Sequence, residues 1–249
     1  MPKNAYEIIR TLMKSCLNAV GFDLIRTNKL SQFNLCGLKS LHIKTIIDVG
    51  ANQGQFVRSM SAHFPQAKFF CFEPLPEAYA VLQNWANGRQ DSVRMFNLAL
   101  GNQDGEAQMF FHRDFSPSSS LLANTITGEK LFPATKNQER MTVKVLTLDH
   151  ALQNTKLEDN ILIKLDVQGY EDRVLEGGKE MFSKAIACIL EISLDSLYDG
   201  QADFRELYTQ LDQMNYRYAG NLDQVHAQDG HVIYLDVVFV RKDINLCHG

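Results

Sequence analysis

Several features that would place a protein in a common functional class are missing from this chain of 249 residues. Lys and Arg form no run and the formal net charge is −4, so the sequence does not favour a nucleic-acid partner held by charge. The apolar runs fall far short of the roughly 20 residues that a membrane-spanning helix needs, so we expect no transmembrane segment. Internal repeats are also absent. What remains is a chain with 45% apolar residues, enough for one sizeable core.

Cysteine is scarce and scattered. The five cysteines are an odd number, and none of them forms a CxxC pair, so neither a disulfide framework nor a zinc site is indicated. Cys71 and Cys188 lie inside apolar runs that are typical of buried strands, where thiols stay reduced. The N-terminus has charges where a secretory signal would need an unbroken apolar stretch. We expect a cytoplasmic protein without a metal site.

The first 44 residues look different from the rest of the chain. Residues 6–20 carry apolar side chains at helical spacing, with Arg10 and Lys14 on the other side, which predicts an amphipathic helix. Such a helix packs on its own domain or on a second subunit, giving a homodimer, and a membrane-surface anchor is the alternative. We therefore predict a helical extension and connector at 1–44, one catalytic domain at 45–243 and a tail at 244–249.

From residue 45 onward, short β-rich apolar runs alternate with amphipathic stretches, as in a parallel sheet covered by helices on both faces. A hairpin closes the pattern, with strands at 217–219 and 232–240. The fold predicted is α/β and Rossmann-like, with a mostly parallel seven-stranded sheet and a C-terminal antiparallel hairpin. The other predicted strands are 45–49, 68–72, 94–98, 161–166 and 187–191, and the predicted helices are 55–64, 76–87, 170–182 and, with an irregular start, 195–212.

The ends of the first two strands carry a pattern that indicates a nucleoside cofactor. Gly50 and Gly54 bracket a turn that lets the backbone lie against a ligand, and the helix that follows offers free N–H groups to a carboxylate. Asp48 in front of the turn would attract a cation, such as the ammonium group of a methionine moiety. Glu73 ends the second strand, where a carboxylate can accept hydrogen bonds from both ribose hydroxyls.

This combination favours S-adenosylmethionine (SAM) over NAD as the cofactor. A dinucleotide loop has the pattern G-x-G-x-x-G, whereas this loop has G-x-x-x-G preceded by an acid. The enzyme predicted is therefore a SAM-dependent methyltransferase of the class I type. A nicotinamide-dependent oxidoreductase with the same fold is the weaker alternative.

Six segments, in order, resemble successive motifs of the FkbM-type methyltransferase family. The most specific is the run K-x-D-x-x-G-x-E from Lys164 to Glu171. The resemblance covers roughly residues 45–243 and implies SAM-dependent O-methylation of a hydroxyl on a small molecule, typically a sugar or a polyketide-like compound. The six segments are 46–54, 72–74, 97–101, 118–121, 146–149 and 163–171.

The motifs, the turn and the family resemblance together give a set of candidate site residues. Asp166, at the end of the fourth strand, is the first candidate for a general base and Glu191 the second, and alternation along the strand places Lys164 beside Asp166. A structural ion pair between Lys164 and Asp166 is the alternative. The predicted cofactor-binding residues are Asp48, Gly50, Asn52, Gly54, Phe56, Glu73, Pro74, Ala99, Leu100 and Asp166. The predicted substrate-binding residues are Ser118, Ser119, Ser120, Gln168 and Glu171.

Two parts of this set leave alternatives open. The family usually has Glu or Asp where this chain has Gln168, and an amide can position a substrate but cannot take a proton. A catalytically silent interaction module with a SAM-binding fold is therefore an alternative function, and Glu171 could simply favour the N-terminus of the next helix. The long polar stretch between His112 and Arg140 contains the three serines, and by resemblance the rest of it forms a lid. A mobile surface loop is the other interpretation.

Overall fold

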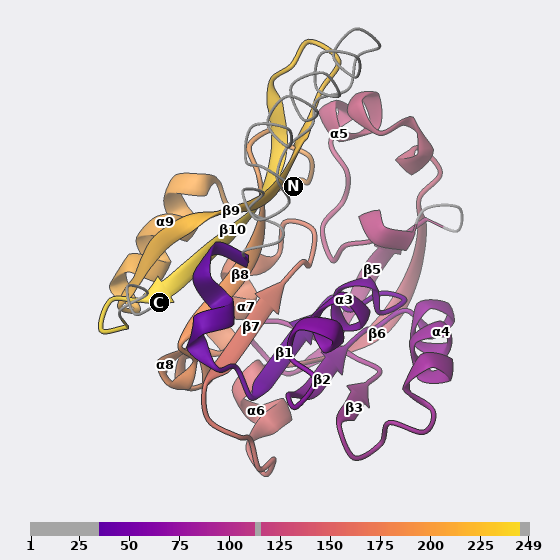
Figure 1. Ribbon diagram of the computed structural model, residues 1–249. Coiled ribbons are helices and arrows are strands. Elements are labelled where there is room, and N and C mark those ends of the chain that lie inside the picture. The colour runs from indigo at the N-terminus through magenta and orange to yellow at the C-terminus, as the bar shows by residue number, and fades with distance from the viewer. Residues whose placement is uncertain (1–34, 113–115, 245–249) are drawn as a thin grey trace, which may run out of the picture.

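The computed structural model describes residues 35–112 and 116–244 (Figure 1). The predicted helix at 6–20, and with it the predicted dimer contact, lies outside the described residues. The first described segment is η2 (Leu35–Leu41), at the end of the predicted connector. Its three buried leucines pack with Ile46 of the first strand in one core cluster. The end of the connector therefore covers part of the sheet.

The described strands form a seven-stranded sheet in the order β3-β2-β1-β7-β8-β10-β9. The first five of these run parallel, and β10 runs antiparallel to both β8 and β9. The predicted α/β fold, with its mostly parallel seven-stranded sheet and C-terminal hairpin, is confirmed. The strands are β1 (Thr45–Val49), β2 (Lys68–Phe72), β3 (Val93–Phe96), β7 (Ile161–Leu165), β8 (Ala187–Ser193), β9 (Tyr216–His226) and β10 (Val232–Arg241).

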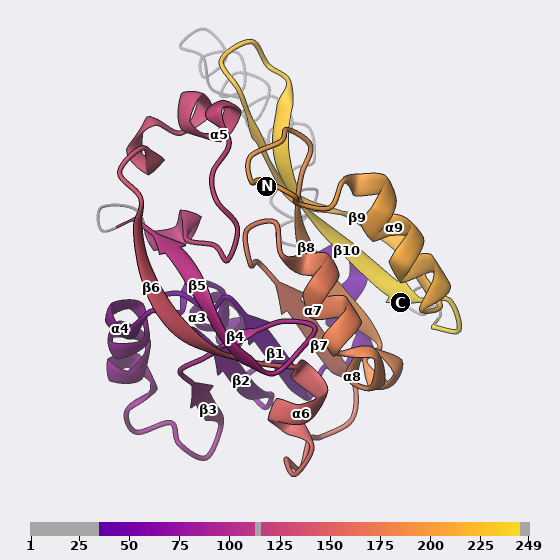
Figure 2. The same cartoon turned by 180° about the vertical axis from the view of Figure 1, so that it is seen from behind.

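Helices cover both faces of this sheet, because alternate residues of its strands are apolar on both sides. On the face seen from the front in Figure 1, Ile46 of β1 packs with η2, α3 (Gln55–His63) and α4 (Pro76–Ala86). On the face seen from the front in Figure 2, Ile47 packs with α6 (Leu148–Leu152), α7 (Glu171–Gly177), α8 (Lys179–Lys184) and α9 (Phe204–Gln213). The two faces of one strand thus belong to two cores.

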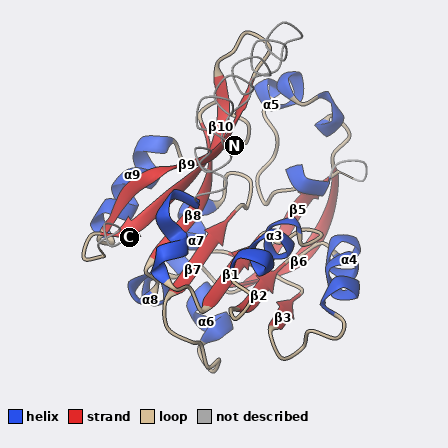
Figure 3. Ribbon diagram, in the orientation of Figure 1, coloured by secondary structure: helices blue, strands red, loops and turns tan. Residues whose placement is uncertain are grey.

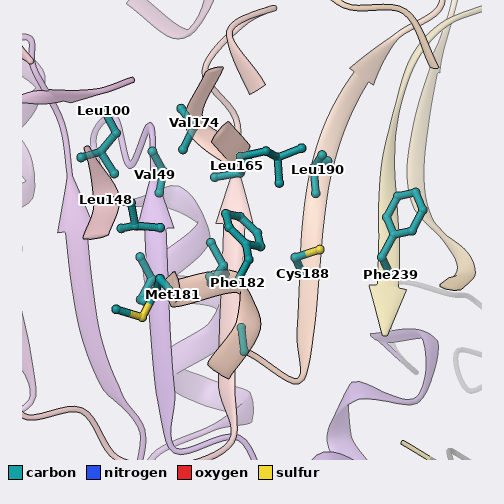
Figure 4. Close-up of a cluster of buried hydrophobic side chains, with 14 of the residues drawn as sticks. Val49, Leu100, Leu148, Leu165, Val174, Met181, Phe182, Cys188, Leu190 and Phe239 are labelled. Carbon is teal, nitrogen blue, oxygen red and sulfur yellow. The ribbon is translucent and has the colours of Figure 1, made fainter. Parts of the chain in front are cut away.

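The second core is dense. Figure 4 shows Leu165, Phe182, Cys188 and Phe239 on the same side of the sheet, and none of these side chains is more than 1% exposed. Burying one large apolar side chain completely contributes roughly 1.5–3 kcal/mol. The sheet is therefore a rigid base for the strand ends on which the site is built.

A second sheet, which the sequence analysis does not predict, lies beside α4 (Figure 3). It has three strands in the order β4-β6-β5, with bounds β4 (Ala99–Leu100), β5 (Gly105–Phe111) and β6 (Glu139–Leu146). The polar stretch between β5 and β6 contains η3 (Ser116–Ser118), α5 (Ile126–Leu131) and η4 (Pro133–Thr135). The residues from Met141 to Val145 alternate between apolar and polar, which is a signal for β6, but nothing in the sequence marks its pairing with β5 across a long insertion.

Two predicted elements have different bounds. The helix predicted at 170–182 is two helices, because the chain bends at Gly177 and Gly178. Gly177 is required there, since a Cβ atom on it would lie 2.0 Å from the carbonyl oxygen of Gly101. The first strand of the hairpin was predicted at 217–219, and β9 extends it to His226, with bulges against β10.

None of the described helices is long and apolar enough to cross a membrane.

Candidate active site

A cavity of about 340 Å³, called the first cavity, opens at the carboxyl ends of β1, β2 and β7. Strand order reverses there, because β2 pairs with one side of β1 and β7 with the other, which is where open α/β sheets bind ligands. Most of the predicted site residues line this cavity. They are Gly50, Asn52, Phe56, Glu73, Pro74, Ala99, Leu100, Ser119, Ser120, Lys164 and Asp166.

The turn after β1 is packed tightly against the turn after β7. Gly50 has a φ of 79°, a left-handed conformation that favours glycine, and a Cβ atom on it would lie 1.8 Å from the backbone oxygen of Asp166. The N–H groups of Gly50 and Ala51 both donate to the carbonyl oxygen of Phe72, at 3.0 Å. The turn is thus fixed to both neighbouring strands.

The helix that follows this turn begins with uncapped N–H groups. Gly54 is its N-cap residue, in a left-handed conformation, and no side chain caps the helix. Gln55 and Phe56, its first residues, line the first cavity, whereas Gly54 does not. The N-terminus of α3 therefore offers free donors and a positive end of the helix dipole to this cavity.

Glu73 is a buried carboxylate in the wall of the first cavity. Its side chain accepts hydrogen bonds from the backbone N–H groups of Asn52 (2.7 Å) and Leu75 (2.8 Å). Burial raises the pKa of Glu73 to about 7, and these two hydrogen bonds only partly oppose that shift. Glu73 is therefore held in one position by the two turns that it joins.

A buried ion-pair cluster lies beside the cavity. Lys164 pairs in register with Asp48 on β1, and its ammonium group donates to Asp166 at 2.7 Å. Burial alone would lower the pKa of Lys164, but the carboxylates of Asp166 and Asp48 outweigh it and raise this pKa. Lys164 Nζ also lies 5.3 Å from the centre of the Phe56 ring. Lys164 therefore remains an ammonium group beside the cavity.

Asp48 does not line the first cavity. Its side chain is completely buried, its carboxylate oxygens have no hydrogen-bond partner among the described residues, and Lys164 Nζ is 3.8 Å away. Burial raises the pKa of Asp48 to about 6, against the attraction of Lys164. The structure thus places Asp48 behind the cavity wall, where it acts on Lys164, and its predicted contact with a cofactor stays a prediction.

Gln168 joins two carboxylates. Its side-chain nitrogen donates to Asp166 at 2.7 Å and to Glu191 at 2.6 Å, and its oxygen accepts a hydrogen bond from the hydroxyl of Tyr198 at 2.5 Å. Burial and the neighbouring carboxylates raise the pKa of Glu191 well above its usual range. An amide has two N–H groups, and both are used here.

A second cavity, of about 110 Å³, lies on the other side of Asp166. It contains the predicted residues Ser118, Gln168 and Glu191, and Asp166 lines both cavities. Glu171 lines neither, because its carboxylate accepts hydrogen bonds from the backbone of Val167 and Gly169 and so holds the turn after β7. The residues that line the second cavity are Pro117, Ser118, Asn124, Gly128, Phe132, Thr135, Asp166, Gln168, Glu191, Leu197, Tyr198 and Tyr234.

The cavity residues that sequence reasoning missed include Asp236 and Tyr198. Asp236 of β10 lines the first cavity and pairs in register with Glu191. Burial raises its pKa to about 6. The signal was present, because Asp236 is the one charged residue in the apolar run at 232–240. Tyr198, 4% exposed, lies in a loop after β8 and has no periodic pattern around it.

The family model described as the methyltransferase FkbM domain matches residues 48–218, which is more than half of the chain. The chain belongs to the FkbM methyltransferase family. The match runs from β1 into β9 and so includes the predicted site residues from Asp48 to Glu191. Tyr234 and Asp236 lie beyond the matched residues of this FkbM-family chain.

Two relatives and a solved structure are similar to this chain. The 2-O-methyltransferase NoeI of Sinorhizobium fredii (strain NBRC 101917 / NGR234) is 32% identical in an alignment of 173 residues that covers 65% of this chain and 68% of the relative. Methyltransferase sdnD of Sordaria araneosa is 29% identical in an alignment of 156 residues that covers 54% of this chain and 60% of that one. The crystal structure of methyltransferase FkbM from Methylobacillus flagellatus KT matches with a TM-score of 0.49 and 16% identity, covering 80% of this chain and 44% of that chain.

Proposed function

We propose that this FkbM-family protein transfers a methyl group from SAM to a hydroxyl oxygen of a small molecule, such as a sugar or a polyketide-like compound. The observation that carries the proposal is the position of Asp166. This carboxylate lines both a cavity suited to a nucleoside and a second, polar cavity. The 32% identity to a 2-O-methyltransferase supports oxygen as the atom that is methylated.

The residues around the first cavity fit SAM. Glu73 at the end of β2 would bind the ribose hydroxyls, and the N-terminus of α3 would bind the carboxylate of the methionine moiety; both line the first cavity, which supports these roles. An apolar wall that includes Phe72, Leu100 and Met109 suits the adenine ring. When bound, SAM supplies a methyl group on a cationic sulfur, and the sulfur keeps the electron pair of the broken bond as a neutral thioether.

Asp166 would accept the proton that the acceptor hydroxyl loses. Lys164 and Gln168 hold the two oxygens of its carboxylate at 2.7 Å each, so its orientation is set before an acceptor arrives. Correct positioning of nucleophile and methyl group can lower the barrier by roughly 7–11 kcal/mol, and a general base adds roughly 10²- to 10⁴-fold. Glu191, which accepts a hydrogen bond from the same Gln168 nitrogen, remains the second candidate for this role.

Three further expectations remain part of the proposal. The division into an extension at 1–44, a methyltransferase domain at 45–243 and a tail at 244–249 is retained. A homodimer formed through the helix at 6–20 is a prediction on residues outside the described ranges. The proposed cytoplasmic location rests on the scattered, unpaired cysteines.

Calorimetric titration with SAM, S-adenosylhomocysteine and NADH in parallel tests the cofactor. We expect binding of the first two, and Glu73→Ala should weaken it by about tenfold or more because it removes the carboxylate from the cavity wall. Glu180→Ala, at an exposed position on α8, is the control. Binding of NADH alone would support the oxidoreductase instead. Binding of SAM without turnover on any hydroxyl compound would support the silent interaction module.

A further inference from the structure

The second cavity is a separate space that meets the first one at a single charged side chain. Asp166 and Pro117 are the residues that line both, and the second cavity otherwise has its own walls. These walls come from the insertion between β5 and β6, from the loop after β8, and from β10. A molecule in the second cavity would therefore lie against the same carboxylate as a molecule in the first.

The walls of the second cavity are fixed to one another by the backbone. Thr125 donates its N–H to the carbonyl of Leu197, and Asp199 donates its N–H to the carbonyl of Ala123. Apolar side chains from the insertion, the loop and the hairpin also form one packed cluster, which includes Phe132, Leu197 and Tyr234. Figure 1 shows α5 and the hairpin at the same end of the molecule. The second cavity is thus a formed pocket with a roof.

Two side chains of this pocket have oxygen atoms with unused capacity to accept hydrogen bonds. The side-chain oxygen of Asn124 is buried and has no partner among the described residues. Within residues 35–112 and 116–244 the Glu191 side chain has one hydrogen bond, from Gln168, which leaves capacity on its carboxyl group. Acceptors without donors favour a ligand that brings O–H or N–H groups.

Gln168 sets the spacing of the two carboxyl groups. Its one side-chain nitrogen lies 2.7 Å from an oxygen of Asp166 and 2.6 Å from an oxygen of Glu191, so the two carboxyl groups are close neighbours. One can contact the hydroxyl that reacts, and the other can contact a hydroxyl on the adjacent carbon. The rings of Phe132 and Tyr234, with centroids 6.3 Å apart, provide an apolar wall for the carbon face of a small ring.

We propose that the second cavity is the acceptor subsite and that it selects a small cyclic compound with two hydroxyl groups on adjacent carbons. The reacting hydroxyl lies at Asp166, and its neighbour is bound by Glu191, which makes Glu191 a specificity-determining residue. This inference rests on the proposed function, because it assumes that the first cavity binds SAM. It adds the class of acceptor and the residue that recognises it.

The test is a cycle between acceptor and enzyme variants. The probes are methyl glycosides of hexoses and 6-deoxyhexoses with adjacent hydroxyls, each compared with derivatives that lack one of the two, and S-adenosylhomocysteine formation is measured. For the wild type, removing the neighbouring hydroxyl should lower kcat/KM by about tenfold or more. For Glu191→Met, kcat/KM for the diol should fall by a similar factor. Removing the neighbouring hydroxyl from the acceptor should then lower kcat/KM of this variant no further.

A second variant and a control guard against loss of folding. Asn124→Leu removes the unpartnered oxygen on the opposite wall and should raise KM for the diol with little change in kcat. Both variants should bind SAM as the wild type does, and Glu180→Gln should match the wild type in every measurement. The acceptor assignment is overturned if the losses of kcat/KM caused by Glu191→Met and by removal of the neighbouring hydroxyl simply multiply. It is also overturned if protein that binds SAM methylates none of the diols. Absence of SAM binding to the wild type overturns the proposed function itself.

Discussion

The first and second cavities share Asp166 but are built by different kinds of contact. Strand ends of the parallel sheet and the turns that follow them make most of the first, and these turns are tied by short backbone hydrogen bonds to adjacent strands. The second is closed by an insertion, a loop and a hairpin that come from distant parts of the chain. The fold therefore sets one side of the site, and additions to the fold set the other.

The largest effect should come from the residue that the two cavities share. Asp166→Asn removes the proposed base while keeping size and most hydrogen bonds, so kcat should fall by roughly 10²- to 10⁴-fold. Affinity for SAM, measured by calorimetry, should change by less than about threefold if Asp166 acts in the chemical step. Asp212→Asn, at an exposed position, is the control. Unchanged turnover would remove Asp166 from the mechanism.

A glycine-to-alanine substitution beside the first cavity should destabilise the protein more than the same substitution elsewhere. Gly50→Ala combines an unfavourable φ with a Cβ atom 1.8 Å from the Asp166 carbonyl oxygen. It should lower the free energy of unfolding by about 3–5 kcal/mol. Gly88 has a similar φ of 80°, but a Cβ atom on it would have no atom within 4 Å. Gly88→Ala should therefore lower the free energy of unfolding, measured by urea unfolding, by about 1–2 kcal/mol. Equal losses for the two variants would contradict the tight packing of the two turns.

The pH dependence of stability probes the buried carboxyl group behind the first cavity. The pKa of Asp48 is raised from 3.8 to about 6, so the folded state holds this proton more tightly than the unfolded chain does. Ionisation of Asp48 should therefore lower the free energy of unfolding by ~3 kcal/mol at most as pH rises from about 4 to about 6.

Asp48→Asn removes this titration. The stability of the variant relative to the wild type, measured by urea unfolding, should thus be higher at pH 7 than at pH 4. Asp212→Asn is again the matched control, since this carboxylate is exposed. The same difference from the wild type at both pH values would show that Asp48 ionises normally.

The smallest effect is expected in the roof of the second cavity. Thr125 caps α5 by accepting a hydrogen bond from Gly128, and its hydroxyl contacts the loop after β8. Thr125→Ala should lower the free energy of unfolding by about 1 kcal/mol and raise KM for the acceptor, with the affinity for SAM unchanged. Thr147→Ala removes a similar cap from α6 and should leave the KM for the acceptor and the affinity for SAM unchanged. A weaker affinity for SAM in Thr125→Ala would mean that the two cavities are not separable.

The sequence predicts the elements around the first cavity better than those around the second. The bounds of β1 and β2 and the positions of Gly50 and Glu73 at the ends of those strands could be predicted, because local periodicity and turn chemistry determine them. The second sheet was missed although β6 alternates from Met141 to Val145, because its partner β5 lies on the far side of a long insertion without a strand pattern. Tyr198 and the amide bridge at Gln168 also escaped, because side-chain contacts between distant loops leave no spacing in the sequence.

The roof of the second cavity has a consequence for how such proteins diverge. Its insertion is joined to the loop after β8 by the N–H and carbonyl groups of the main chain, including a β-bridge between Asn124 and Tyr198. Bonds of this kind do not depend on which side chains project from the two segments. Descendants of one ancestor can therefore exchange the side chains that line the second cavity while keeping the same frame. The lining of the second cavity can thus change without rebuilding the strand ends and turns of the first.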